Sequence, residues 1–262
     1  MGQLNLVLSS PVLSLYPTNI IAITIIVTSV ELLSSLKIQL YLDLELFYHL
    51  EGYLTERRKD LFHKVLNERT RHFTVATEDV YQLHNTSAVM RTCDIFGIQD
   101  LYVVEESVGK NVDREIAMGA QKWMNLNRYH AIGDCIDTLK NSGYQIIATT
   151  PHNDSTLLHE FDISKKSAFF FGKETVGLSD TVIQAADGFL KIPMYGFTES
   201  LNISVSAAII LQHVIAKLKQ SNIEWQLSDA EKLEIQMAWM KRSIKSSDMI
   251  IERFYADSGK SK

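Results

Sequence analysis

The stretch that most constrains the fold spans residues 192–204 and reads IPMYGFTESLNIS. It follows a short apolar run and opens into residues 203–219, whose apolar residues recur with helical spacing. Small polar residues crowd the start of that predicted helix, namely Ser200, Asn202, Ser204 and Ser206. Such side chains cap a helix or hold a ligand against its N-terminus. Residues 192–204 are therefore predicted to connect a strand to a helix and to offer a ligand site.

Strand and helix patterns alternate along the chain before this stretch. The alternation favours an α/β fold with a parallel sheet covered on both faces. Ligands bind beyond the carboxyl ends of such strands, so the loops after them are expected to carry the site. The predicted strands are 72–77, 100–104, 125–129, 144–149, 168–171 and 188–192. The predicted helices are 85–96 (with Asn85 as N-cap), 112–123, 132–141, 180–186 and 203–219, and Gly97 and Gly143 are predicted to end two of them.

Two further helical regions flank this pattern. Residues 56–71 hold six Lys or Arg against three Asp or Glu, with Leu61, Val65 and Leu66 at helical spacing. They predict an amphipathic helix with a cationic face, and an ordinary solvated face is the alternative. Residues 227–255 predict one or two more helices, whose apolar stripe holds Leu233, Met237, Met240 and Ile244.

Composition limits the function classes. The 262 residues are 46% apolar and 22% charged, as in globular proteins, and a formal net charge of −5 excludes a strongly basic nucleic-acid binder as a property of the whole chain. Cys93 and Cys135 lack the spacing of a zinc site or a disulfide framework, so we expect no metal and a reducing, cytoplasmic compartment. The apolar run at residues 20–30 is shorter than the roughly 20 residues of a membrane span, so we expect no membrane association. An added strand or loop, or upstream sequence that is not part of the working protein, would explain it.

Two more segments carry unusual residues. Residues 85–97 place Asn85 six positions before Arg91, and a helix cap plus a surface arginine would explain this pair without any function. Residues 171–177 read FGKETVG, in which glycines flank a lone carboxylate, Glu174. Glycines let the backbone approach a ligand closely, but this is neither a dinucleotide fingerprint nor a P-loop.

In this order the three segments resemble the motifs of the SpoU-type RNA ribose 2′-O-methyltransferases of the SPOUT class, and most closely the TrmH-type group that methylates guanosine 18 of tRNA. The first motif matches at Asn85, Ser87-Ala88, Arg91 and Gly97, and the second at Gly172, Glu174 and Gly177. The third matches residues 192–204, with Ile203 where Val is usual. The resemblance extends from about Glu56 to Tyr255, roughly three-quarters of the chain.

The resemblance implies a C-terminal trefoil knot, a rare exception to unknotted topology. It implies a homodimer, with S-adenosylmethionine as the cofactor and tRNA as the substrate. It divides the chain into an apolar extension (1–55), an RNA-contacting helix (56–72), a knotted methyltransferase domain (73–222) and a C-terminal helical extension (223–262). The residues expected to line the cofactor are Thr149, Gly172, Ile192, Met194 and Leu201.

The same resemblance implies that Arg91 acts at the ribose hydroxyl. It could act as a neutral base, or it could remain cationic, bind the adjacent phosphate and stabilise the developing alkoxide. Asn85 and Glu174 would orient Arg91 and the ribose, and Glu174 is a second candidate for the base. Ser200 and Asn202 would position Arg91 or the phosphate. The expected RNA contacts are Arg58, Lys64, Arg69 and Arg71, since phosphate contacts dominate such affinity.

Alternative functions remain open from the sequence. A ribosomal-RNA ribose methyltransferase is one, although such members usually carry a separate N-terminal RNA-binding domain. A non-catalytic knotted RNA-binding protein is another, and the presence of Asn85, Arg91, Glu174 and Asn202 argues against it. A nicotinamide dehydrogenase is the poorest candidate, because no dinucleotide fingerprint follows an early strand.

Overall fold

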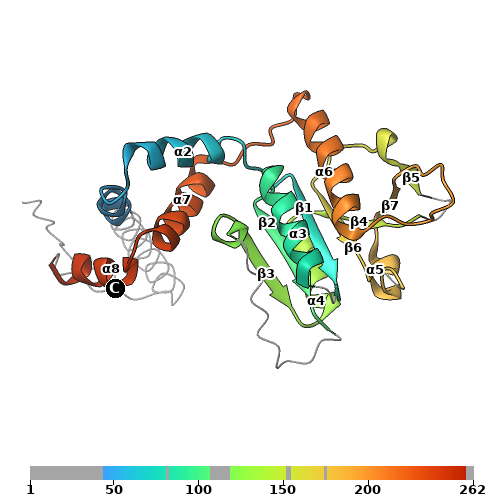
Figure 1. The fold of residues 1–262 in the computed structure, drawn as a ribbon, viewed down its shortest axis with the longest axis horizontal. Coiled ribbons are helices and arrows are strands. Elements are labelled where there is room, and N and C mark those ends of the chain that lie inside the picture. The colour runs from blue at the N-terminus through green and yellow to red at the C-terminus, as the bar shows by residue number, and fades with distance from the viewer. Residues whose placement is uncertain (1–43, 81–82, 107–118, 152–154, 174–175, 258–262) are drawn as a thin grey trace, which may run out of the picture. The chain divides into compact units, whose positions relative to one another are not determined.

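The computed structural model describes residues 44–80, 83–106, 119–151, 155–173 and 176–257 (Figure 1). The described residues form two compact units. One comprises 44–52 and 250–257, and the other is Tyr53–Met249. In the first unit, residues 44–51 are helical, and the rings of His49 and Phe254 lie 5.1 Å apart.

A seven-stranded, entirely parallel sheet organises the larger unit (Figure 1). Its spatial order is β3-β2-β1-β6-β4-β7-β5. Every residue of β1, β2 and β6 is buried, as expected where helices cover both faces of a parallel sheet. The strands are β1 (Phe73–Glu78), β2 (Asp100–Val104), β3 (Asn125–Tyr129), β4 (Gln145–Thr149), β5 (Thr156–Leu157), β6 (Ser167–Phe171) and β7 (Gly188–Lys191).

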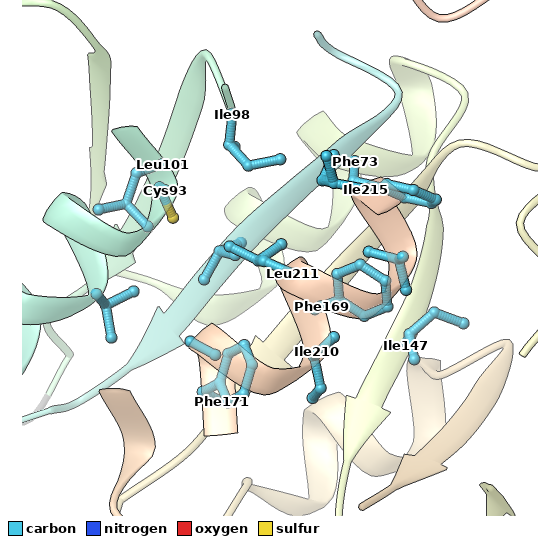
Figure 2. Close-up of a cluster of buried hydrophobic side chains, with 14 of the residues drawn as sticks. Phe73, Cys93, Ile98, Leu101, Ile147, Phe169, Phe171, Ile210, Leu211 and Ile215 are labelled. Atoms are coloured by element: carbon cyan, nitrogen blue, oxygen red, sulfur yellow. The ribbon is translucent and has the colours of Figure 1, made fainter. Parts of the chain in front are cut away.

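The alternation of side chains along the strands divides the core into two layers. On one face, Phe169 and Phe171 pack with α3 (Leu83–Ile95) and α6 (Ile203–Lys219) in the cluster of Figure 2. On the other face, Phe170 packs with α4 (Ile132–Asn141) and α5 (Asp180–Ala185). The period of two along β6 thus supplies both layers from consecutive residues.

The flanking helices α2 (Glu56–Leu66) and α7 (Asp229–Ser243) belong to the same unit as the sheet. Phe62 of α2 and Trp239 of α7 pack edge-on against each other and against Trp123, which follows the short helix η1 (Ala120–Lys122). The last helix is α8 (Ser247–Asp257), and a second short helix, η2, spans Leu158–Glu160.

The structure confirms the predicted α/β class and the parallel sheet, and it reproduces the ranges of β2, β3, α4 and α6. Gly97 and Gly143 follow their helices with φ of 77° and 80°. The two-residue strand β5 was not predicted, and most of the predicted helix 112–123 lies outside the described residues.

Three sequence predictions were wrong in detail. Asn85 does not cap α3, because the helix already includes Leu83. On α2, Leu66 is buried as predicted, but Leu61 is 49% exposed and Phe62 is buried in its place; the helix also ends at Leu66, before the predicted end at residue 71. On α7 the buried residues are Ile235, Gln236, Trp239 and Met240, and of the predicted stripe only Met240 is among them.

Candidate functional site

A cavity of about 960 Å³ opens at the carboxyl ends of β4, β6 and β7. Three segments line it, one after each of these strands, and the start of α6 completes the wall. The volume lies at the upper end of the range for small-molecule sites. All five residues predicted to bind the cofactor are in its lining: Thr149, Gly172, Ile192, Met194 and Leu201.

The second segment is a tight backbone turn. Lys173 and Gly177 exchange two backbone hydrogen bonds of 3.0 and 2.8 Å. A Cβ on Gly172 would lie 2.2 Å from the backbone of Gly177, so any other residue would force this turn open. Thr149 fixes the neighbouring segment, because its hydroxyl donates to the carbonyl of Phe170 over 2.7 Å. Backbone and small side chains therefore form much of the wall.

Asn202 connects this cavity to α3. It is the N-cap of α6, and its Oδ1 accepts from the backbone N–H and the hydroxyl of Ser204 at 2.8 and 2.6 Å. Its Nδ2 donates to Oδ1 of Asn85 over 3.3 Å. Asn85 is buried and Ser200 is exposed in the cavity lining. The structure thus brings together three of the five predicted catalytic residues.

Arg91 is separate from these three: it is exposed on α3 and is not in the cavity lining. No salt bridge holds it within the described part of the chain. Glu174 lies outside the described residues.

The four predicted RNA contacts separate into two kinds. Arg58 and Lys64 are exposed on α2, and the Arg58 guanidinium lies 5.9 Å from the ring centre of Trp123. Arg69 is only 1% exposed and pairs with Asp94 and with the carbonyl oxygen of Ile98. Its guanidinium is enclosed and already bound inside the protein, which argues against an RNA contact by Arg69, and that contact stays a prediction.

Arg71 is held between two carboxylates. Its Nε and Nη1 each lie 2.9 Å from an oxygen, of Asp100 and of Glu231 respectively. Burial alone would lower the pKa of Arg71, but the two carboxylates outweigh it and raise the pKa above its usual value. Most of its charge is thus neutralised within the protein, and an RNA contact by Arg71 stays a prediction.

Neither cysteine is suited to act as a nucleophile or as a metal ligand. Both are buried, and burial raises the pKa of both thiols, to about 12 for Cys135. A protonated thiol is a poor nucleophile and a poor metal ligand. Within the described ranges, no group of three His, Cys, Asp or Glu side chains could hold a metal ion. No described helix is both long and apolar enough to cross a membrane.

Sequence reasoning missed two features near the cavity. Glu78 and Asp79 are buried at the end of β1 beside the turn at Gly172, and the signal was two consecutive acids ending an apolar strand. Several exposed apolar side chains also lie on the last lining segment and on α6. They are Tyr195, Phe197, Leu201, Val205 and Ile209, and the spacing of four between the last three was the available signal.

Comparison with known proteins gives consistent matches. Residues 72–212 match the SpoU rRNA Methylase family. A tRNA (guanosine(18)-2′-O)-methyltransferase of Borreliella burgdorferi is 39% identical over 201 residues, which cover 77% of this chain and 92% of that protein. A protein of the same name from Thermus thermophilus is 37% identical over 60% of this chain and 81% of its own length.

Solved structures agree with the fold. The crystal structure of the A. aeolicus TrmH/SpoU tRNA modifying enzyme superposes with a TM-score of 0.64 at 31% identity, over 72% of this chain and 98% of that one. The SpoU methyltransferase AviRb from Streptomyces viridochromogenes, in complex with the cofactor AdoMet, gives a TM-score of 0.51 at 22% identity, over 61% and 62% of the two chains. The second likeness concerns the fold alone.

Proposed function

This chain belongs to the SpoU rRNA Methylase family, and from that premise we propose that it transfers the methyl group of S-adenosylmethionine to the 2′-hydroxyl of guanosine 18 in tRNA. The observation that carries the proposal is the cavity at the carboxyl ends of β4, β6 and β7, which the second and third family motifs line and to which Asn85 of the first motif is joined through Asn202. The names of the relatives at 39% and 37% identity support the tRNA substrate. Ribosomal RNA is the alternative substrate, and the family description alone would favour it.

The cavity suits the donor by size and by wall chemistry. Gly172 permits a close approach of backbone, and Ile192, Met194 and Leu201 supply apolar contacts around the polar Thr149. When bound, S-adenosylmethionine supplies an electrophilic methyl group. The protein then has to orient the ribose oxygen and support its loss of a proton.

We assign the oxygen-directed role to Arg91. Its side chain is exposed, and a guanidinium is suited to bind a phosphate and to stabilise a developing alkoxide. This favours the electrostatic role over the neutral-base role. Asn85 and Asn202 hold α3 against the start of α6, and Ser200 and Glu174 complete the proposed set of orienting residues.

A homodimer would complete this site. Arg91 is not in the cavity lining, and exposed apolar side chains lie on the same loop and helix as the lining residue Leu201, namely Tyr195, Phe197, Val205 and Ile209. Exposed apolar side chains that gather on a surface are a common feature of subunit interfaces. We propose that a second copy of the chain covers these side chains and brings its own Arg91 near the donor. Light scattering on the purified protein should give twice the mass of the 29.7 kDa chain.

The trefoil knot and the cytoplasmic location are further parts of the proposal. The lining segments after β4, β6 and β7 converge on one cavity, as a threaded backbone would require. A tRNA substrate and two buried free thiols suit the cytoplasm.

Labelled donor provides the test of activity. Incubation of the protein with S-adenosylmethionine carrying a labelled methyl group should label an unmodified tRNA transcript. The matched control is the same tRNA with 2′-deoxyguanosine at position 18, which should stay unlabelled. Equal labelling of both would refute the assigned oxygen, and absence of donor binding would favour a non-catalytic RNA-binding protein.

A further inference from the structure

Two consecutive carboxylates are buried where β1 ends. Glu78 is 5% and Asp79 is 4% exposed. Strand β1 lies between β2 and β6, so its carboxyl end is next to the turn that follows β6. Burying two carboxylates is unfavourable unless each finds a partner. Both find one in the segment 172–179, of which residues 172–173 and 176–179 are described.

Asp79 binds the beginning of this segment. Its Oδ2 lies 3.1 Å from Nζ of Lys173, and its own backbone N–H donates to the carbonyl of Val104 over 2.9 Å. Its φ of 48° falls in the left-handed region, which aspartate tolerates better than most residues. Asp79 thereby turns the chain out of the sheet toward α3 while it holds Lys173.

Glu78 binds the end of the same segment. Its Oε2 accepts the backbone N–H of Ser179 over 2.9 Å. Ser179 is the N-cap of α5, with its hydroxyl oxygen 3.4 Å from the backbone nitrogen of Val182. The two neighbouring acids of β1 therefore hold the two ends of one segment.

The segment between them forms part of the cavity wall. Gly172, Lys173, Gly177 and Leu178 all line the cavity. The paired hydrogen bonds between Lys173 and Gly177 join these two residues to each other, but they do not fix where they sit relative to the sheet. The contacts of Glu78 and Asp79 fix the position of this segment relative to the sheet.

We infer that Glu78 and Asp79 are positioning residues that set the shape of the donor pocket by holding the segment 172–179 at both ends. They act through Lys173 and Ser179 and need no contact with the donor. Asp79 also lies shortly before Asn85, the first residue of the first motif. Its contact with Lys173 therefore couples the first motif to the second. The inference rests on the proposed function for its effect on the donor, but not for its effect on the segment.

Three variants test it: Asp79→Asn, Lys173→Met and the double variant. Asparagine keeps the shape and the tolerance for positive φ and removes only the charge. The matched control is Asp100→Asn, which removes a buried carboxylate that pairs with Arg71 at the amino end of β2. The readouts are calorimetric binding of the demethylated donor product and amide hydrogen exchange in peptides containing Lys173, Gly177 and Ser179.

Each single variant should weaken product binding about tenfold, and the double variant should weaken it no further, because both remove one contact. Exchange should accelerate in these peptides and not in β2, whereas Asp100→Asn should leave product affinity unchanged. Unaltered exchange and affinity in Lys173→Met, whose side chain is partly exposed and less critical for folding, would overturn the inference. If the wild-type protein binds no product, the proposed function fails, and the exchange data still decide the inference.

Discussion

The polar side chains that are exposed at the cavity and on α3 differ from the two arginines that precede β1. Beside the amino ends of the strands, Arg69 is enclosed and pairs with Asp94, and Arg71 lies between Asp100 and Glu231. Around the cavity and α3, the side chains of Ser200, Asn202 and Arg91 are exposed.

This difference separates charged side chains that stabilise the fold from charged side chains that are available to bind a substrate. A buried guanidinium requires its partners, so Arg69 is committed to holding the fold, whereas Arg71 is paired with two carboxylates but partly exposed. An exposed guanidinium carries little desolvation penalty and can bind a phosphate, so Arg91 is available for a substrate. Arg69, Arg71 and Arg91 look alike in the sequence, and only the burial and pairing of each side chain tell them apart.

Replacement of Arg91 should have the largest effect on activity. Arg91→Ala should lower kcat about 10²–10³-fold, as loss of a single oxyanion donor does in other enzymes. The melting temperature should stay within a degree or so, because the side chain is exposed. Single-turnover methylation and a thermal melt measure the two. Arg91→Lys provides the control, and full activity in that variant would refute any role specific to the guanidinium.

Replacement of Arg69 should reverse this pattern. Arg69→Ala leaves Asp94 without its partner and should lower the free energy of unfolding by about 3 kcal/mol, as for other broken buried pairs. The single-turnover rate of the folded fraction should change little. Urea unfolding measures the loss of stability, and active-site titration gives the folded fraction to which the methylation rate is referred. A stable Arg69→Ala protein that had lost tRNA affinity would support the RNA contact that the sequence suggested.

Two variants of Asn202 can separate its role as the N-cap of α6 from its hydrogen bond to Asn85 on α3. Asn202→Asp keeps the acceptor that caps α6 and loses the donor to Asn85, whereas Asn202→Ala loses both. We expect the alanine variant to lose about 1 kcal/mol of stability and the aspartate variant to keep most of it. Both should lose methylation activity to a similar extent. Normal activity in the aspartate variant would show that the link is dispensable.

The exposed basic residues of α2 should give the smallest effect. Arg58→Glu with Lys64→Glu should weaken tRNA binding several-fold and reduce the salt dependence of binding by about two phosphate contacts. Donor affinity should not change. Filter binding at several salt concentrations measures this. An unchanged salt slope would remove α2 from the RNA-binding surface.

The sequence predicted what depends on local pattern. Apolar periodicity and the stop at Gly143 located α4, and the spacing of Asn202 and Ser204 located the start of α6. The five expected cavity residues came from motif resemblance, and all five line the cavity.

Features that depend on distant partners escaped prediction. Arg69 resembled a surface cation because Asp94 lies 25 positions further along the chain. The burial of Phe62 in place of Leu61 depends on Trp123 and Trp239, which no local pattern could place. The contacts of Glu78 and Asp79 with the segment 172–179 likewise exist only once β1 and β6 are adjacent.

Mass-spectrometric mapping of the methylated nucleotide tests the central claim most directly. An unmodified tRNA transcript treated with the protein and S-adenosylmethionine would be digested and sequenced by fragment mass. The account predicts one added methyl group, on the ribose of guanosine 18. A methyl group on a base or on another nucleotide would contradict it.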